Sequence, residues 1–70
     1  MATKIAENVR MRFKKETTGA VQYEEVNNRN ELVEMNNPNC KIGVLYVRKS
    51  TLAAAGVQSP GLIIVSVNAE

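Results

Sequence analysis

Residues 42–47 of this 70-residue chain read IGVLYV, and this segment decides which fold the sequence predicts. Apolar side chains fill both alternating sets of positions, which are Ile42, Val44 and Tyr46 in one set and Leu45 and Val47 in the other. A strand with one face in water alternates apolar and polar residues instead. The segment therefore predicts a central strand that is covered on both of its faces.

Three further segments have the composition of strands. In the first, over about residues 5–15, the apolar Val9, Met11 and Phe13 alternate with the basic Arg10, Arg12 and Lys14. Residues 20–26 and 62–68 are rich in the branched and aromatic side chains that strands favour. Together with a central strand over about 41–49, they predict a mainly β protein. We expect a small, curled, four-stranded antiparallel sheet.

The first two strands are expected to form a hairpin, and two registers compete. A two-residue loop ending at Gly19 would pair Phe13 with Glu24, an aromatic residue with a charge. A three-residue loop pairs Phe13 with Tyr23 instead. It also sets Arg12 opposite Glu24 and puts Gly19 where the turn needs a positive φ. We predict the three-residue loop, because it satisfies the turn and both cross-strand pairs.

The remaining segments predict a loop, a helical turn and a loose end. Residues 27–39 contain six asparagines and predict a flexible Asn-rich loop, either a projecting hairpin or an ordered binding loop, with a short extended piece over 31–35. Residues 51–55 predict a short helical turn, with Ser50 as its N-cap and Gly56 as its left-handed end. We expect residues 1–4 to fray.

Size and composition favour one domain, residues 1–70, that is completed by dimerisation. A core in so short a chain supplies only about 3–5 kcal/mol, so small domains usually need a supplement. Cys40 is the single cysteine, and histidine and aspartate are absent, which argues against a disulfide, a metal site or a cofactor. A homodimer, joined face to face or along a sheet edge, is the supplement that we expect.

Catalysis and membrane insertion are not expected. Without histidine or aspartate, the usual general bases and catalytic triads are missing, and neighbouring Glu24 and Glu25 point to opposite faces of a strand. The apolar runs are too short to span a bilayer. A lone thiol without an export signal favours the cytoplasm, or the host cytoplasm if the protein is viral.

Six residues form the candidate binding site for an anion or a nucleic acid. Three cations alternate along the first strand at about 7 Å, a spacing comparable with that of phosphates. Two more precede a serine where the helical turn begins, a position that attracts anions. A solvated basic face is the simpler explanation of both clusters. The candidate residues are Arg10, Arg12, Lys14, Arg48, Lys49 and Ser50.

Three parts of the sequence resemble short uncharacterised β-rich proteins of phages and bacteria. They read FxKET at residues 13–17, YEE at 23–25 and IGxLYVxKSxL at 42–52. The resemblance covers about residues 13–67, implies a viral or mobile-element origin, and assigns no functional residue.

Three hypotheses of function follow. The first is a non-enzymatic phage-type factor that binds an unknown protein through a sheet edge or the 27–39 loop. The second is a homodimeric β protein that holds nucleic acid on the Arg10, Arg12 and Lys14 face. The third is a structural or assembly subunit. The first ranks highest, because the net charge is only +2 and no aromatic stacking platform is evident.

Overall fold

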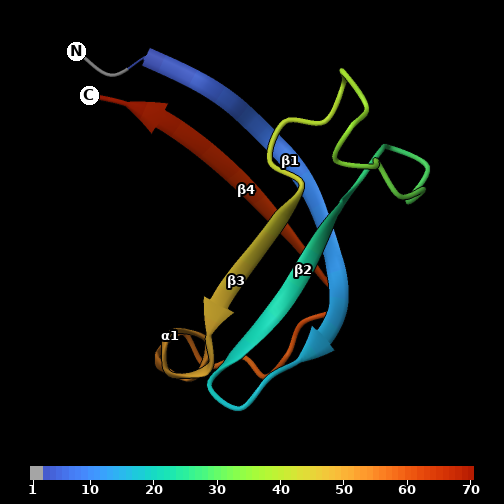
Figure 1. Ribbon diagram of the computed structural model, residues 1–70. Helices are drawn as coiled ribbons and strands as arrows, with labels where there is room; N and C mark the ends of the chain where they lie inside the picture. The colour runs from blue at the N-terminus through green and yellow to red at the C-terminus, as the bar shows by residue number, and fades with distance from the viewer. Residues whose placement is uncertain (1–2) are drawn as a thin grey trace.

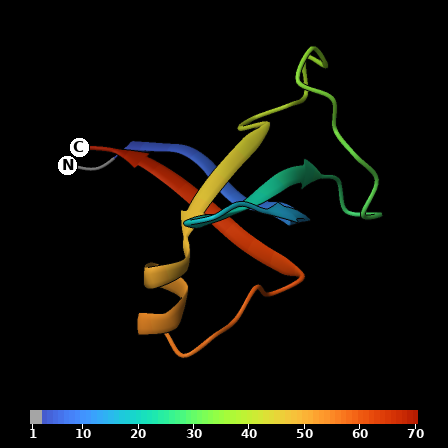
Figure 2. The ribbon, with the colours of Figure 1, turned by 60° about the horizontal axis from the view of Figure 1, so that its bottom comes forward.

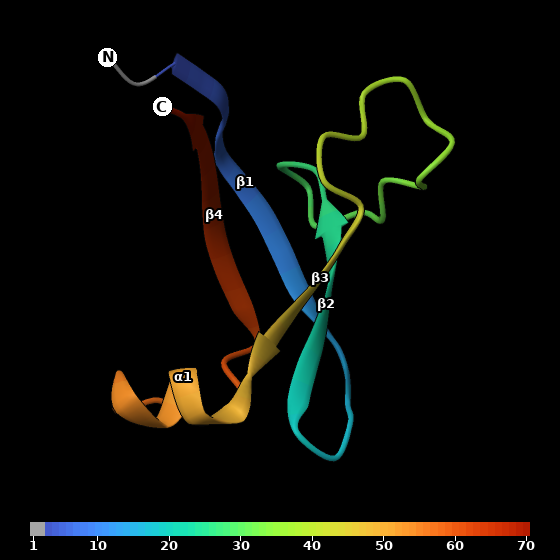
Figure 3. The same ribbon diagram turned by 60° about the vertical axis from the view of Figure 1, so that its left-hand side comes forward.

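The computed structural model describes residues 3–70, which form four strands and one short helix (Figure 1). The elements are β1 (Thr3–Glu16), β2 (Ala20–Val26), β3 (Val44–Arg48), α1 (Lys49–Ala54) and β4 (Leu62–Ala69). All neighbouring strands are antiparallel, and their order in the sheet is β3-β2-β1-β4. The sheet curls into half of a barrel (Figure 3). The predicted mainly β, four-stranded antiparallel fold is therefore confirmed.

The prediction that residues 42–47 form a central strand is wrong. The strand in this region, β3, lies at one edge of the sheet and begins only at Val44. The backbone of Gly43 has a φ of 89°, which interrupts the extended conformation just before the strand. Leu45 and Val47 pack against the core, whereas Tyr46 is 58% exposed. Apolar residues on both sides of this strand thus do not mean that both sides are covered.

The centre of the β1–β2 hairpin has the predicted register. Phe13 pairs with Tyr23, and their ring centroids lie 6.4 Å apart in an edge-to-face arrangement. Arg12 pairs with Glu24. The two pairs occupy successive positions along the strands, so their side chains point to opposite faces of the sheet.

The turn that closes this hairpin differs from the prediction. The register shifts by one residue between Phe13 and Lys15, so the extra residue is accommodated in the strand and not at Gly19. Among residues 3–70, the glycines with positive φ are Gly43 and Gly56. At the tip, the Thr17 amide donates to the carbonyl of Ala20 at 2.8 Å. The tip is therefore the two-residue loop Thr18–Gly19. The bulge at Lys14 shifts the register by one residue and so brings Phe13 opposite Tyr23.

One face of the sheet, called here the inner face, carries the core. Met11, Val21 and Tyr23 are fully buried there, and Ala6 and Val9 complete the centre. Leu52 of α1 packs against the same cluster, so the helix covers part of this face (Figure 2). The partly buried residues that surround the cluster are Ile42, Leu45, Val47, Ile63 and Val65.

Helix α1 begins earlier than predicted. Its N-cap is Arg48 in an extended conformation, and Ser50 lies inside the helix without a side-chain capping bond, so the prediction of a Ser50 cap is wrong. The predicted end is correct, because Gly56 has a φ of 80°. Two closing hydrogen bonds run from Gly56 N to Ala53 O and from Val57 N to Leu52 O, both 3.0 Å. No helix within residues 3–70 has the length and apolar character that crossing a membrane requires.

The beginning of β1 and the end of β4 lie side by side at one end of the sheet (Figure 1). Thr3 pairs with Ala69 and Lys4 with Asn68, so these residues belong to β1, although fraying was predicted there. Met1 and Ala2, the rest of that predicted loose end, lie outside the described residues.

The Tyr23 hydroxyl provides a test of the core. It donates to the carbonyl of Pro60 at 2.8 Å and thereby ties the segment before β4 to β2. We expect Tyr23→Phe to lower the free energy of unfolding, measured in urea, by about 1 kcal/mol, because a part-buried carbonyl loses its donor. The matched change Tyr46→Phe on the exposed side of β3 should have no measurable effect. Equal stabilities of the two variants would contradict the role of this bond.

Candidate interaction surface

The opposite side of the sheet, called here the outer face, carries the basic row that the sequence predicts. Residues directly opposite each other on antiparallel strands share a face. Arg12 is opposite Glu24 on β2 and Leu62 on β4, and Glu24 is in turn opposite Val44 on β3. Charged side chains therefore occupy the middle of the outer face, and apolar side chains of the two edge strands flank them.

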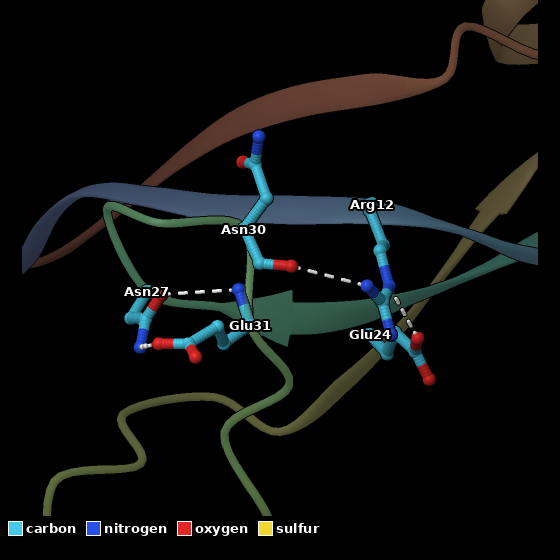
Figure 4. Close-up of polar contacts among 5 residues, drawn as sticks. All are labelled: Arg12, Glu24, Asn27, Asn30 and Glu31. Atoms are coloured by element: carbon cyan, nitrogen blue, oxygen red, sulfur yellow. Dashed lines mark hydrogen bonds and ion pairs between the residues drawn. The ribbon is translucent and has the colours of Figure 1, made fainter.

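Both arginines of this row have partners within the protein, and Figure 4 shows those of Arg12. Arg12 Nε lies 2.6 Å from Glu24 Oε2, and a second nitrogen of Arg12 donates to the carbonyl of Asn30 at 3.1 Å. Arg10 donates to Asn30 Oδ1 at 2.9 Å. We call these four residues the arginine clasp. It holds the beginning of the β2–β3 connection onto the outer face.

The turn held by the clasp is built by asparagine side chains. Asn27 Oδ1 accepts bonds from the amides of Arg29 and Glu31 at 2.8 and 3.0 Å, and Asn27 Nδ2 donates to the Glu31 carboxylate at 3.1 Å (Figure 4). Asn30 has a φ of 62°, a left-handed conformation that asparagine tolerates better than most residues. The asparagines that looked like a compositional bias in the sequence thus build a specific turn.

The end of the same connection is held by Glu25, whose side chain is on the inner face and is 4% exposed as a residue. Its Oε1 accepts hydrogen bonds from three consecutive backbone amides, those of Lys41 at 3.0 Å, Ile42 at 2.7 Å and Gly43 at 3.1 Å. The left-handed φ of Gly43 helps these amides to converge on one oxygen. We call this arrangement the Glu25 nest.

The environment shifts the pKa values of two groups in the nest. Burial raises the pKa of Glu25, but the amides of Ile42, Gly43 and Lys41 stabilise the carboxylate more strongly, so its pKa is lowered. The Cys40 thiol lies 3.7 Å from Glu25 Oε1, and its pKa is raised by burial and by the adjacent negative charge. The nest therefore favours a charged carboxylate beside a neutral thiol.

Further bonds fix the connection between its two anchors. The Val33 amide donates to the Glu25 carbonyl at 3.0 Å, and Leu32 forms an isolated bridge with Val26. We predicted a short extended piece over residues 31–35, and of this piece only the Leu32 bridge forms. Between the anchors, Leu32 is 49% and Met35 is 71% exposed. The connection thus presents two apolar side chains from a hydrogen-bonded framework.

The other predicted site residues do not join the arginines in one cluster. Arg48 and Ser50 are exposed at the beginning of α1, and Lys14 is the exposed extra residue of the β1 bulge. Lys49 Nζ lies 3.2 Å from Glu16 Oε2. Both residues line a hollow of about 300 Å³ beside α1. A hydrogen bond from Ser59 and the charge of Lys49 lower the pKa of Glu16. The structure thus brings Arg10 and Arg12 together on the outer face, where both have partners, and leaves the other candidate residues apart from them.

The sequence contains no sign of the Glu25 nest. It correctly placed Glu24 and Glu25 on opposite faces, but nothing in the segment before β3 identifies its amides as the partners of Glu25. Within residues 3–70, no three side chains that could bind a metal ion cluster together. Comparison with protein-family models, with curated proteins and with solved structures found no match to this chain.

Acid should weaken the fold through Glu25. Because folding lowers the pKa of this carboxylate, its stabilising effect is complete well above its ordinary pKa of 4.5 and is lost as the pH falls through the lowered value. We expect Glu25→Gln to lower the free energy of unfolding at pH 7 by about 2 kcal/mol, because three amides lose a charged acceptor. The variant should also be less sensitive than the wild type to acid.

Glu34→Gln is the matched control for this prediction, because Glu34 is exposed in the same connection and its carboxylate has no hydrogen bond among the described residues. Urea denaturation at pH 7 and at acid pH measures both variants. An unchanged acid sensitivity in Glu25→Gln would contradict the assignment of the lowered pKa to the nest.

Proposed function

We propose that this chain is a non-enzymatic small binding protein that acts through protein–protein contact. Its binding surface is the β2–β3 connection, residues 27–43, with Leu32 and Met35 as the apolar contacts. The phage or mobile-element type of protein that the sequence pattern resembles, working in a host cytoplasm, fits this proposal. Small factors of that kind need an exposed surface for a partner and no catalytic groups.

The observation that carries the proposal is that this connection is held in place and yet keeps Leu32 and Met35 exposed. The nest and the clasp use a buried carboxylate and two arginines to hold it. Yet Met35 remains 71% exposed. A loop fixed in one conformation loses little entropy when it binds, and exposed apolar side chains along it give a partner surface to bury. This combination supports a binding role for the connection.

Nucleic-acid binding ranks second. Arg10 and Arg12 already donate to Asn30 and Glu24, so a phosphate would have to compete with these bonds. Lys14 and Arg48 are exposed, but they do not extend the arginine row. The third candidate, an assembly subunit, depends on contacts between copies of the chain.

The proposal predicts that negative charges in place of Leu32 and Met35 abolish partner binding. Immobilised wild-type protein and the double variant Leu32→Asp with Met35→Asp are incubated with lysate of the host cell. We expect the wild type to retain a specific protein that the variant loses, because the negative charges would have to be buried in the interface. Circular dichroism confirms that the variant is folded.

The control is Val57→Asp, which places the same charge on an exposed apolar residue beside α1, away from the connection. It should retain the partner. If the double variant retains every protein that the wild type captures, the connection is not the binding surface. Loss of the partner in Arg48→Glu alone would favour the basic end of β3 instead.

A further inference from the structure

Strand β4 is an open edge of the sheet that carries no charge. It pairs with β1 on one side only, and its eight residues read LIIVSVNA. Open edges in monomeric proteins are usually protected by charged residues, proline, bulges or short length. The other edge, β3, has five residues and ends at Arg48. On β4, Leu62 is 39%, Ile64 54% and Val67 37% exposed. The strand carries no charge and no proline, and the two register shifts in its pairing with β1 place the extra residues on β1.

The backbone of β4 also has free hydrogen-bonding groups at this edge. Phe13 N donates to Gly61 O at 2.9 Å, so the N–H and C=O of Gly61 point toward β1. The N–H and C=O of successive residues point to alternate sides of a strand, so those of Ile63 and Val65 also face β1. Those of Leu62 and Ile64 therefore face the open edge and are available to another strand.

We propose that β4 pairs antiparallel with β4 of a second copy of this chain, so that two four-stranded sheets become one sheet of eight strands. The register that we infer puts Val65 opposite Val65 of the second copy, on the two-fold axis. Ile64 then lies opposite Ser66, and all residues from 62 to 68 are paired. In this register the free peptide groups of Ile64 form hydrogen bonds across the axis.

A second copy fits this edge because of its charge and its faces. In a symmetric antiparallel pair, residues near the axis meet themselves or close neighbours, so any charge would meet its like. Strand β4 has none. On the inner face, Ile63 would lie opposite Val67 of the second copy, and apolar surface would be buried on both chains. One such contact also removes the unprotected edge of both copies.

The experiment measures the oligomeric state of the full chain by sedimentation equilibrium over a range of concentrations. We expect a wild-type dimer, and a dissociation constant raised by more than about tenfold in Ile64→Pro, because proline removes an N–H that faces the open edge and leaves β1 pairing in place. Ile64→Lys, which places like charges near the axis, should act in the same direction. Tyr46→Lys on the β3 edge is the matched control and should remain a dimer.

A disulfide tests the register. In a Cys40→Ser background, Val65→Cys should form a cross-linked dimer on oxidation, because facing residues of a non-hydrogen-bonded pair have the separation that a disulfide needs. Ile63→Cys should not, since its two copies would lie four positions apart. A wild-type monomer, an open-ended assembly, or a dimer that Ile64→Pro leaves intact would overturn the proposal. None of these outcomes decides whether the β2–β3 connection binds another protein.

Discussion

The rest of the structure depends on the contact between the Glu25 carboxylate and three backbone amides of residues 41–43. A carboxylate buried to this extent would be costly without partners, and the three amides would be equally costly without an acceptor. The contact solves both problems, because Ile42 N reaches Glu25 Oε1 at 2.7 Å and its neighbours share the same oxygen. It also fixes where the long connection ends and where β3 can begin.

Much of the architecture follows from that constraint. Once Gly43 is held beside Glu25, the five residues of β3 pair with β2, and Leu45 and Val47 reach the core. The arginine clasp holds the start of the connection on the other side of the sheet. A chain of 70 residues with one cysteine thus orders a long connection with polar contacts. The connection keeps Leu32 and Met35 exposed, and the β4 edge carries no charge.

The sequence predicted those features that depend on neighbouring residues. Alternation located β1 and β4, the Phe13–Tyr23 pairing fixed the hairpin, and Gly56 marked the end of the helix. The sequence did not predict the features that depend on contacts between residues far apart in the chain. The apolar pattern of β3 does not reveal that its outer side is uncovered, and the basic row does not reveal that Asn30 folds back onto Arg10 and Arg12. The strand order and the Glu25 nest depend on contacts that periodicity does not encode.

The β2–β3 connection is a fixed part of the fold, and Glu25 holds its end. Amide hydrogen exchange of the wild-type protein, followed by nuclear magnetic resonance, tests it most directly. The amides of Lys41, Ile42 and Gly43 lie outside the regular strands, yet they should be protected to a degree comparable with the β2–β3 pairing. Exchange of these three amides at the rate of an unstructured loop would contradict the account.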